Sequence, residues 1–316
     1  MPHFFNRINE EIRHRVEARF AEHYSGLDVS IGNRDDEYRS AARDDGFTVL
    51  GISEAVEAAG IVVVLIPDEE IPECFTASIR PHLRPGEAVC FASGYALAFG
   101  LVDLPAGIDV LLLAPRMLGE EVRRSYVDGA GFFAYISVEQ DASGRGLDRL
   151  LALAHAAGVL RKGAMPLRAS DEALLDLFIE QTVGPYLGTT IQVAFALGVD
   201  AGLPPEAMVL EMYMSGEMAR TFQAFADAGF FESVGWHGVV AQYGGFLRTM
   251  ELDRGAMTAM FSSVLEDIRS GGFAARFQEE RDAGGPTLAA IAAVKEAGNA
   301  MTEAERRVRD ALATRP

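Results

Sequence analysis

Two acidic side chains on one apolar stretch carry the strongest indication of chemistry in this sequence. Asp176 and Glu180 lie four residues apart, so a helix would project both carboxylates from the same face. The residues around them, from Leu174 to Ile179, are mostly apolar, and a pair of acids on a mostly buried helix usually has a reason. Two carboxylates this close repel each other unless a cation lies between them, and Mg²⁺ accepts one or two carboxylates while keeping several waters. The spacing therefore permits a magnesium site, with a solvated acidic face as the alternative.

A second acidic pair lies further along the chain. Glu211 and Glu217 are six residues apart, which on an ideal helix turns their side chains about 120° from each other. A local bulge near Gly216 would bring them together, so both arrangements remain open for Glu217. Asp176 and Glu180 are candidate metal ligands by their spacing, and Glu211 and Glu217 become candidates only through the family resemblance given below.

The elements that must position these groups fall into two halves. In the first half, apolar runs typical of strands alternate with helical patterns, and most runs are continuous, as expected for strands buried on both faces of a parallel sheet. From Asp171 onward the pattern is helical to the end. We therefore expect an α/β Rossmann-like domain over residues 1–167 and an all-helical domain over residues 168–316. The expected strands are Asp28–Gly32, Ile61–Pro67, Ala88–Ala92, Asp109–Pro115 and Phe132–Val138.

Four loops follow the expected strands at the edge where open α/β sheets bind their ligands. An arginine there, such as Arg116, can clamp a carboxylate with two hydrogen bonds. A serine such as Ser93 can orient a substrate oxygen, but it is a poor proton acceptor unless a base lies beside it. Ordinary loop chemistry is the alternative for both residues.

The loop after the first expected strand is where the adenosine ribose of a dinucleotide lies in such folds. Arg34 could face a 2′-phosphate there, whereas the acidic run Asp35–Glu37 would accept from a 2′-hydroxyl and repel a phosphate. A solvated acidic turn is the simpler interpretation of these residues alone. With the neighbouring loops, the candidate cofactor contacts are Arg34, Asp35, Pro67, Asp68 and Gly94.

A glycine-rich phosphate loop is missing from its expected position. A dinucleotide fold opens with a strand, a G-x-G-x-x-G turn and a helix. Here a helical pattern over Ile8–Tyr24 precedes the first strand, which behaves as the second strand of the fold. The matching spacing at Gly129–Ala134 comes before a strand, so we expect a turn there without a phosphate role. The first strand of the sheet is therefore expected to be absent.

The charge, the cysteines and the apolar runs of the chain bear on which binding partners it can have and where it works. The formal net charge is −18, and such a surface repels nucleic-acid backbones. Cys74 and Cys90 match neither a metal spacing nor a disulfide framework, which favours a reducing cytoplasm. The longest apolar run, near Gly60 to Pro67, is too short to span a bilayer. We therefore expect a cytoplasmic protein with neither a nucleic-acid partner nor a membrane partner.

Several segments, in the same order along the chain, resemble one family of enzymes. Asp176–Gln181 reads D-L-F-I-E-Q and resembles the D-L-F-x-E-Q metal motif of ketol-acid reductoisomerases. Other segments similar to that family lie in both halves of the chain: Leu65–Glu69, Phe91–Gly100, Ala114–Arg116, Val122–Tyr126, Gln140–Gly144, Gln242–Gly244 and Ser270–Ala274.

The resemblance implies a fold and an activity. Members of that family convert acetohydroxy acids to dihydroxy acids in branched-chain amino-acid biosynthesis, by an alkyl migration followed by reduction with a nicotinamide cofactor and assisted by Mg²⁺. Their Rossmann-like domain is followed by a knotted all-helical domain, and their subunits pair so that the helical domains build each site together. For this chain the resemblance implies NAD(P)H and Mg²⁺ as cofactors, a 2-keto or acetohydroxy acid as substrate, and a homodimer or higher homo-oligomer.

The sequence departs from that family at positions that matter for the chemistry. Ser93 stands in place of the family's active-site histidine, and Arg116 stands in place of its lysine. Ser215 occupies the position four residues after Glu211, where the family has a second glutamate, and Gly238 replaces a substrate-binding serine. By the resemblance, the candidate catalytic residues are Ser93, Arg116, Asp176 and Glu180.

Three interpretations of the whole chain remain. The first is an NAD(P)H- and Mg²⁺-dependent oxidoreductase with diverged catalytic residues. The second is a catalytically lapsed paralogue with a binding or regulatory role. The third is that the N-terminal segment is a mis-started or frame-shifted version of a complete gene. Because Ser93 replaces a general acid–base group while Arg116 keeps a positive charge, we expect reduction of a 2-keto acid to be favoured over isomerisation of an acetohydroxy acid.

Overall fold

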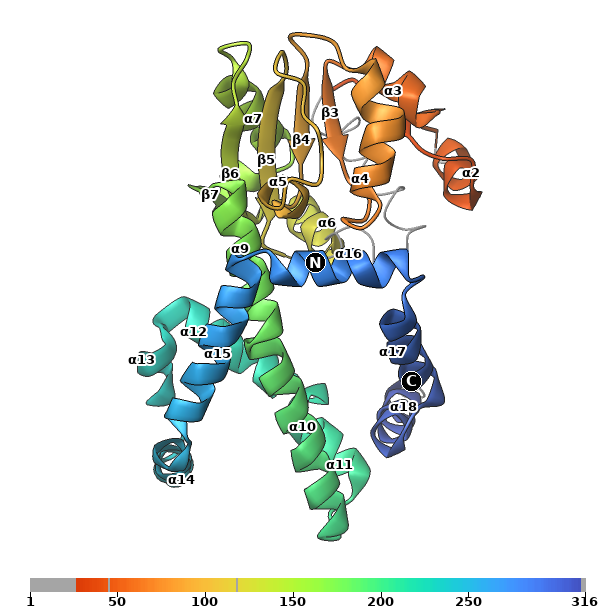
Figure 1. Ribbon diagram of the computed structural model, residues 1–316. Helices are drawn as coiled ribbons and strands as arrows, with labels where there is room; N and C mark the ends of the chain where they lie inside the picture. Colours follow the sequence, from red (N-terminus) through yellow and green to blue (C-terminus); the bar gives the residue numbers. More distant parts are fainter. Residues whose placement is uncertain (1–26, 45, 118, 314–316) are drawn as a thin grey trace. The chain divides into compact units, whose positions relative to one another are not determined.

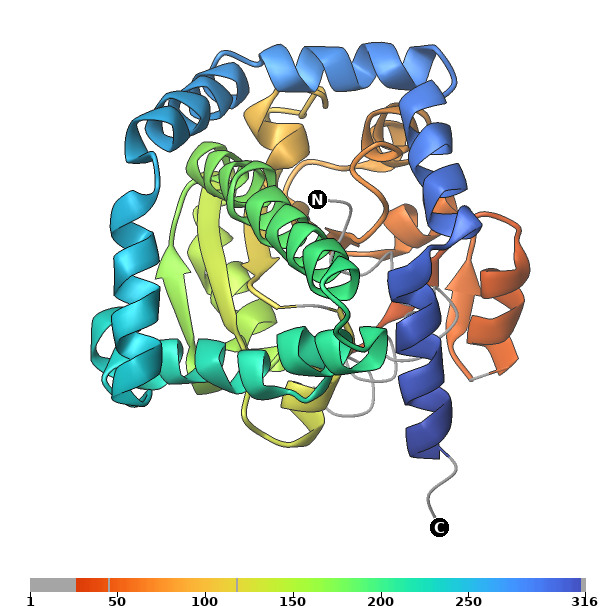
Figure 2. The same ribbon diagram turned by 90° about the horizontal axis from the view of Figure 1, so that it is seen from below.

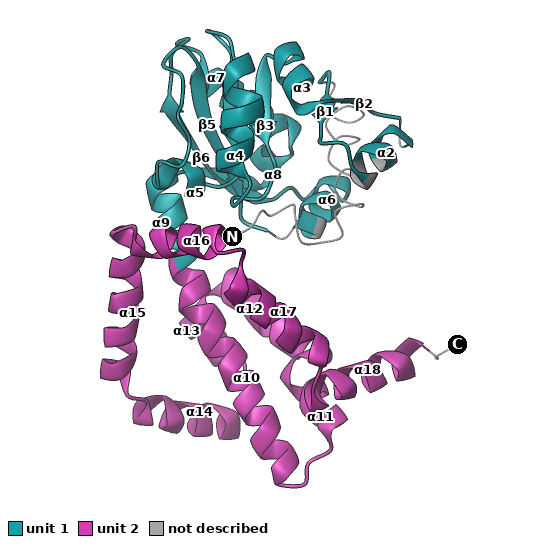
Figure 3. Ribbon diagram, turned by 45° about the vertical axis from the view of Figure 1, so that its right-hand side comes forward, with its two compact units in different colours: residues 1–177 teal, residues 178–316 magenta. Residues whose placement is uncertain are grey.

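The computed structural model describes residues 27–44, 46–117 and 119–313, which fall into two compact units (Figure 3). Unit 1 ends at Leu177 and unit 2 begins at Phe178. Both residues belong to helix α9, Ala169–Gln181, so the division falls inside a helix. The expected helix over Ile8–Tyr24, and the region where a glycine loop would stand, lie outside the described residues.

Unit 1 contains a five-stranded sheet in the order β3-β4-β5-β6-β7 (Figure 1). Its strands are β3 (Ile61–Val64), β4 (Ala88–Phe91), β5 (Asp109–Pro115), β6 (Phe133–Gln140) and β7 (Gly163–Pro166). A separate parallel pair is formed by β1 (Ser30–Gly32) and β2 (Thr48–Leu50). All five strands predicted from the sequence are present, whereas β2 and β7, of three and four residues, were not predicted.

Helices cover both faces of the sheet, and this explains the continuous apolar runs. Successive residues of a strand point to opposite faces. Phe91 of β4 therefore packs in one buried cluster with Phe75, while its neighbour Cys90 packs in a second cluster with Leu150. The helical segments of the first cluster are α3 (Ile52–Ala58), α4 (Ile71–Cys74), the π-helical turn η1 (Phe75–Ile79) and α5 (Tyr95–Ala98). Those of the second are α7 (Gly146–Ala156) and α8 (Val159–Lys162). The remaining helices of the unit are α2 (Glu37–Asp44), η2 (Arg80–His82) and α6 (Gly119–Val127).

Strand β6 runs antiparallel to β5, which corrects the prediction of a wholly parallel sheet. The pairings β3–β4, β4–β5 and β6–β7 are parallel. Ala134 and Ile136 of β6 are buried whereas Phe133 is exposed, and such alternation is typical of antiparallel strands. An antiparallel strand within a largely parallel sheet is common, so the fold is still Rossmann-like.

The turn before β6 depends on glycine. Gly129 and Gly131 have φ values of +73° and +67°, a backbone region that favours glycine over other residues. A Cβ on Gly131 would also lie 2.5 Å from the carbonyl oxygen of Gly158. The segment Gly129–Ala134 is thus a turn that leads into a strand, as predicted.

Unit 2 is helical throughout its described residues, as the sequence predicted. Figure 2 shows the later helices following one another around α10. None of the helices in the described part of the chain is long and apolar enough to cross a membrane. The helices are α10 (Val183–Asp200), α11 (Pro205–Val209), the π-helical turn η3 (Leu210–Met214), α12 (Glu217–Ala228), α13 (Phe230–Val234), α14 (Val239–Glu251), α15 (Arg254–Arg269), α16 (Gly272–Asp282), α17 (Pro286–Ala297) and α18 (Ala300–Ala313).

The buried core of unit 2 is small for its length. One cluster joins Phe195, Val209, Ala304 and Val308. Many large apolar side chains stay exposed, and Met250 of α14 is 86% exposed. Helices in soluble proteins normally bury an apolar face against a neighbour. In the single chain, unit 2 therefore leaves much apolar surface uncovered.

Candidate active site

Side chains from three strand ends and one helix meet at the carboxyl edge of the sheet in unit 1. Asp68 follows β3, Ser93 follows β4 and Arg116 follows β5. Because these strands run parallel, their carboxyl ends lie at the same edge. Helix α9 supplies the other two members, Glu172 and Asp176. These five residues are called the edge cluster below.

Arg116 bridges the two acids of α9. Its Nη2 donates to Glu172 Oε1 at 2.6 Å, and its Nη1 donates to Asp176 Oδ1 at 2.8 Å. Its Nε donates to the carbonyl oxygen of Pro115 at 3.0 Å, and its Cζ lies 5.0 Å from the centre of the Tyr135 ring. A planar guanidinium can hold two carboxylates in fixed directions, whereas a lysine ammonium acts as a point charge. Arginine at this position therefore links the end of β5 to α9.

Glu172 is the residue of this cluster that sequence reasoning missed. Its side chain is only 1% exposed, and its Oε2 accepts a hydrogen bond from the Gly94 backbone N–H at 2.7 Å. Burial raises the pKa of Glu172, the Arg116 guanidinium acts in the opposite direction, and Asp176 adds to the increase. The signal was present in the spacing, because Glu172 precedes Asp176 by four residues, the same interval that separates Asp176 from Glu180.

Gly94 allows the loop after β4 to approach α9. A Cβ added there would lie 2.3 Å from the carbonyl oxygen of Ala169 and 2.7 Å from Glu172 Oε2. Its backbone N–H already donates to Glu172. A cofactor contact through Gly94 stays a prediction, and the bond that the structure shows joins two elements of the protein.

Asp68 and Ser93 form a hydrogen-bonded pair. Ser93 Oγ donates to Asp68 Oδ2 at 3.2 Å and accepts from the Tyr95 backbone N–H, also at 3.2 Å. Asp68 is 4% exposed, and burial raises its pKa to about 8. Nearby Glu172 and Glu69 also raise this pKa, and the hydrogen bond from Ser93 lowers it. The sequence placed Asp68 among the cofactor contacts, which stays a prediction; in the structure its carboxylate accepts a hydrogen bond from the serine hydroxyl.

The other predicted cofactor contacts lie in loops with internal hydrogen bonds. Arg34 Nε donates to Asp36 Oδ2 at 3.1 Å, and the Asp36 carboxylate also accepts from the Arg39 backbone N–H at the start of α2. Asp35 is 92% exposed and lies 3.6 Å from Arg39 Nη1. The carbonyl oxygen of Pro67 accepts from the Glu70 N–H at 2.8 Å. The two bonds of the Asp36 carboxylate connect the loop after β1 to the start of α2. They also direct the Arg34 guanidinium toward an acid of the same loop.

The predicted metal ligands lie on separate elements. Glu180 is one turn after Asp176 on α9, while Glu211 lies in η3 and Glu217 begins α12. Gly216, at φ +82°, separates η3 from α12 between the last two, and whether Glu217 joins Glu211 at a metal stays a prediction. Both glutamates are exposed. Within the described residues, no three Asp, Glu, His or Cys side chains are placed to hold a metal ion, so the four-ligand set stays a prediction.

Family models match both halves of the chain. The model described as acetohydroxy acid isomeroreductase, NADPH-binding domain, matches residues 18–163. The model described as ketol-acid reductoisomerase, C-terminal domain, matches residues 170–314. Together with the Rossmann-like sheet and its edge cluster, these matches define the class of protein as an NAD(P)H-dependent oxidoreductase.

Individual relatives agree over most of the chain. The ketol-acid reductoisomerase (NADP(+)) of Methanothermobacter thermautotrophicus is 35% identical over 271 residues, covering 84% of this chain and 80% of the relative. That of Beutenbergia cavernae is 34% identical over 275 residues, covering 86% and 80%. The structure of an NADH-preferring ketol-acid reductoisomerase from an uncultured archean has a TM-score of 0.86 at 27% identity, covering 93% of this chain and 90% of that one. The chain belongs to the ketol-acid reductoisomerase family.

Proposed function

We propose that this protein converts an acetohydroxy acid, or reduces a related 2-keto acid, with NAD(P)H and Mg²⁺. The observation that carries the proposal is the bridge from Arg116 to Glu172 and Asp176 at the sheet edge where Rossmann-like folds bind ligands. It places a cation and two carboxylates beside the Asp68–Ser93 pair. Such a set can bind an anionic substrate, hold a divalent metal and move a proton.

Arg116 is suited to hold the substrate carboxylate. A guanidinium has five N–H donors, and the bonds to Pro115, Glu172 and Asp176 engage three of them. The remaining donors can face an anion while the bonds to α9 fix the plane of the group. The Arg116 side chain is 24% exposed, so it is within reach of a small molecule. Ser93, at the neighbouring strand end, would orient a substrate oxygen.

Asp176 and Glu180 would hold the metal. Carboxylate oxygens are the protein ligands that Mg²⁺ prefers, and the two acids are one turn apart on α9. An ionised carboxylate has about four lone-pair sites, so the bond from Arg116 to Asp176 Oδ1 leaves room for a cation. This donor set fits Mg²⁺, with Glu211 of the partner subunit as a further ligand and Glu217 as an alternative. When bound, the ion would supply a Lewis acid for the substrate carbonyl.

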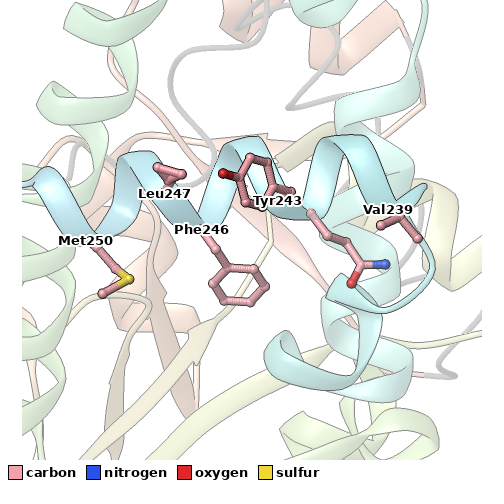
Figure 4. Close-up of a pocket in the computed structure, with 6 residues that line it drawn as sticks. Val239, Tyr243, Phe246, Leu247 and Met250 are labelled. Carbon is pink, nitrogen blue, oxygen red and sulfur yellow. The ribbon is translucent and has the colours of Figure 1, made fainter.

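The exposed apolar surface of unit 2 supports the pairing of subunits. Along α14 it forms an exposed, mostly apolar face (Figure 4), whose residues are Val239, Gln242, Tyr243, Phe246, Leu247 and Met250. Uncovered apolar surface of this kind is typical of an interface between subunits. We expect a second copy of the chain to cover it. Sedimentation velocity at micromolar concentration should show at least a dimer, and a stable monomer would contradict this assignment.

A comparison of two substrates tests the proposed function. With excess Mg²⁺ and matched concentrations, 3-hydroxy-3-methyl-2-ketobutyrate should be reduced faster than 2-acetolactate is isomerised and reduced. The reason is that isomerisation needs a base for the substrate hydroxyl, and here the base lies one hydrogen bond behind Ser93. Oxidation of the nicotinamide measures both rates. Equal rates would show that Ser93 and Arg116 suffice for the full reaction, and no turnover of either would favour a lapsed paralogue with a binding or regulatory role.

The cofactor is expected to be NADH rather than NADPH. Arg34 is bound to Asp36 and therefore is poorly placed to pair with a 2′-phosphate, while Asp35 adds exposed negative charge to the same loop. A phosphate would be repelled there, and a 2′-hydroxyl would find acceptors. Fluorescence titration should give a lower dissociation constant for NADH, and Asp36→Asn should narrow the difference by releasing Arg34. Tighter binding of NADPH by the unmodified protein would overturn this expectation.

A further inference from the structure

The hydroxyl of Ser93 has a fixed direction. Its oxygen accepts a hydrogen bond from the Tyr95 backbone N–H, and its own proton points to Asp68 Oδ2, each over 3.2 Å. The first bond uses one lone pair of the oxygen, and the second commits its hydrogen. A second lone pair remains for a proton from a third group. Ser93 can therefore receive a proton only if it passes its own proton to Asp68.

We propose that Asp68 acts through Ser93 as the proton acceptor for the alkyl-migration half of the reaction. This inference rests on the proposed function, and it gives the buried aspartate an acid–base role behind Ser93, the residue that by the resemblance stands in place of the family's active-site histidine. Asp68 follows β3 and Ser93 follows β4, so two neighbouring strand ends hold the pair together. Asp68 is then a positioning and proton-holding residue that does not itself touch the substrate.

The proton transfer balances within the isomerisation. The O–H bond of the substrate's tertiary hydroxyl breaks, and its proton moves to Ser93 Oγ. The original Ser93 proton moves to Asp68 Oδ2, which leaves a neutral carboxylic acid. The electron pair left on the substrate oxygen forms the new C=O bond as the alkyl group migrates with its bonding pair to the neighbouring carbonyl carbon. The oxygen of that former carbonyl becomes an alkoxide, and it takes the proton back along the same route.

The surroundings of Asp68 suit this exchange. At 4% exposure the carboxylate is largely removed from water, and burial raises its pKa to about 8, with Glu69 and Glu172 adding to the increase. A group that gains and loses a proton near neutral pH is an efficient acid–base catalyst. Reduction of the 2-keto acid depends less on the pair, because the alkoxide formed by hydride transfer is a strong base that water can protonate.

The test measures kcat and KM for both substrates in the unmodified enzyme, Asp68→Asn, Ser93→Ala and the double variant. Asp68→Asn should lower kcat on 2-acetolactate by about 10²-fold and change KM much less, while keto-acid reduction falls by only a few-fold. Ser93→Ala should cause the same loss, and the double variant should lose no more than either single variant, because the two residues act as one unit. Glu73→Gln, which removes an exposed acid of α4 that is not among the groups shifting the Asp68 pKa, is the matched control and should leave the ratio of the two rates unchanged.

Asparagine has nearly the same shape as aspartate and removes a buried charge, so Asp68→Asn should still fold, and thermal unfolding checks this. Ser93→Ala tests the same pair if it does not. Equal losses on both substrates, or losses that multiply in the double variant, would overturn the inference while leaving the proposed function standing. An unmodified enzyme that turns over neither substrate would overturn both.

Discussion

Replacing Arg116 with methionine is expected to lower the free energy of unfolding by about 3–5 kcal/mol at neutral pH, because removal of one partner leaves a buried charge uncompensated. Methionine fills a similar volume but offers no donor. Glu172, at 1% exposure, would then keep only the Gly94 N–H as a hydrogen-bond donor among the contacts described above. Asp176, which is 14% exposed, can turn to water and should contribute less. Urea unfolding measures the difference.

The loss of stability in Arg116→Met should depend on pH with a definite sign. In the folded protein burial already raises the pKa of Glu172, and Arg116 opposes that rise, so its removal should raise the pKa further. A carboxyl group whose folded pKa exceeds its unfolded value binds protons better in the folded state. Its favourable contribution is complete below the unfolded pKa and is lost as pH increases through the folded pKa. The variant should therefore come nearest to the unmodified protein in acid and fall furthest below it at and above neutral pH.

Two controls separate the buried bridge from surface charge. Arg116→Lys keeps a cation and should recover part of the stability, although one ammonium cannot reproduce the two directed bonds. Arg124→Met removes an exposed ion pair with Glu121, and such pairs contribute about 0–1 kcal/mol. If Arg116→Met were no more destabilising than Arg124→Met, the bridge would have no structural importance.

Asp176→Asn is expected to weaken Mg²⁺ binding by tenfold or more, since about 1.4 kcal/mol already gives that factor. Asparagine keeps the shape and can still accept a hydrogen bond from Arg116, so the change removes charge with little effect on packing. A bound ion stabilises the folded state by an amount that grows with its concentration relative to the dissociation constant. The increase in melting temperature with added Mg²⁺ should therefore shrink in the variant. Activity should fall with it, and excess Mg²⁺ should restore only part of the loss.

The matched control for the metal is Asp171→Asn. Asp171 is an exposed acid in the first turn of the same helix, so its substitution makes the same chemical change away from the edge cluster. It should leave Mg²⁺-dependent stabilisation unchanged, whereas Glu180→Gln should behave like Asp176→Asn. Equal stabilisation by Mg²⁺ in the unmodified protein and in Asp176→Asn would remove this pair of acids from the metal site.

Sequence patterns predicted the layers of the fold but not every pairing in it. The runs at β4 and β5 are apolar without interruption because helices pack against both faces, and that physical cause is visible in the residues themselves. The direction of β6 was not predicted, because its first four residues, 133–136, are all apolar and hide the alternation that an antiparallel strand would show. Strand β2 is three residues long, too short for any period to show.

Residues of the candidate site that lie in family-like segments could be predicted from the sequence. Contacts between residues that are distant in the sequence could not, because only the fold brings those residues together. Ser93, Arg116 and Asp176 were found through segments that resemble the family, and the structure places them at one sheet edge. The four-residue interval before Asp176 marks Glu172 as a candidate, but its contact with Gly94, 78 residues away, leaves no pattern in the sequence. The hydrogen bond between Asp68 and Ser93 was not predicted, because nothing local indicates that the Asp68 side chain points to the next strand end.

The contact between Gly94 and the start of α9 also limits how this site can evolve. No side chain larger than hydrogen fits at position 94 without displacing the Ala169 carbonyl or the Glu172 carboxylate. The Ser93 side chain, one residue earlier, is directed instead toward Asp68 after the neighbouring strand, and by the resemblance it stands in place of a histidine. Under the proposed mechanism, the side chain at position 93 can change while the attachment of the loop through Gly94 stays constant. Two adjacent residues of the loop after β4 thus have different constraints. Gly94 keeps the geometry of the site, and the residue at position 93 can change its chemistry.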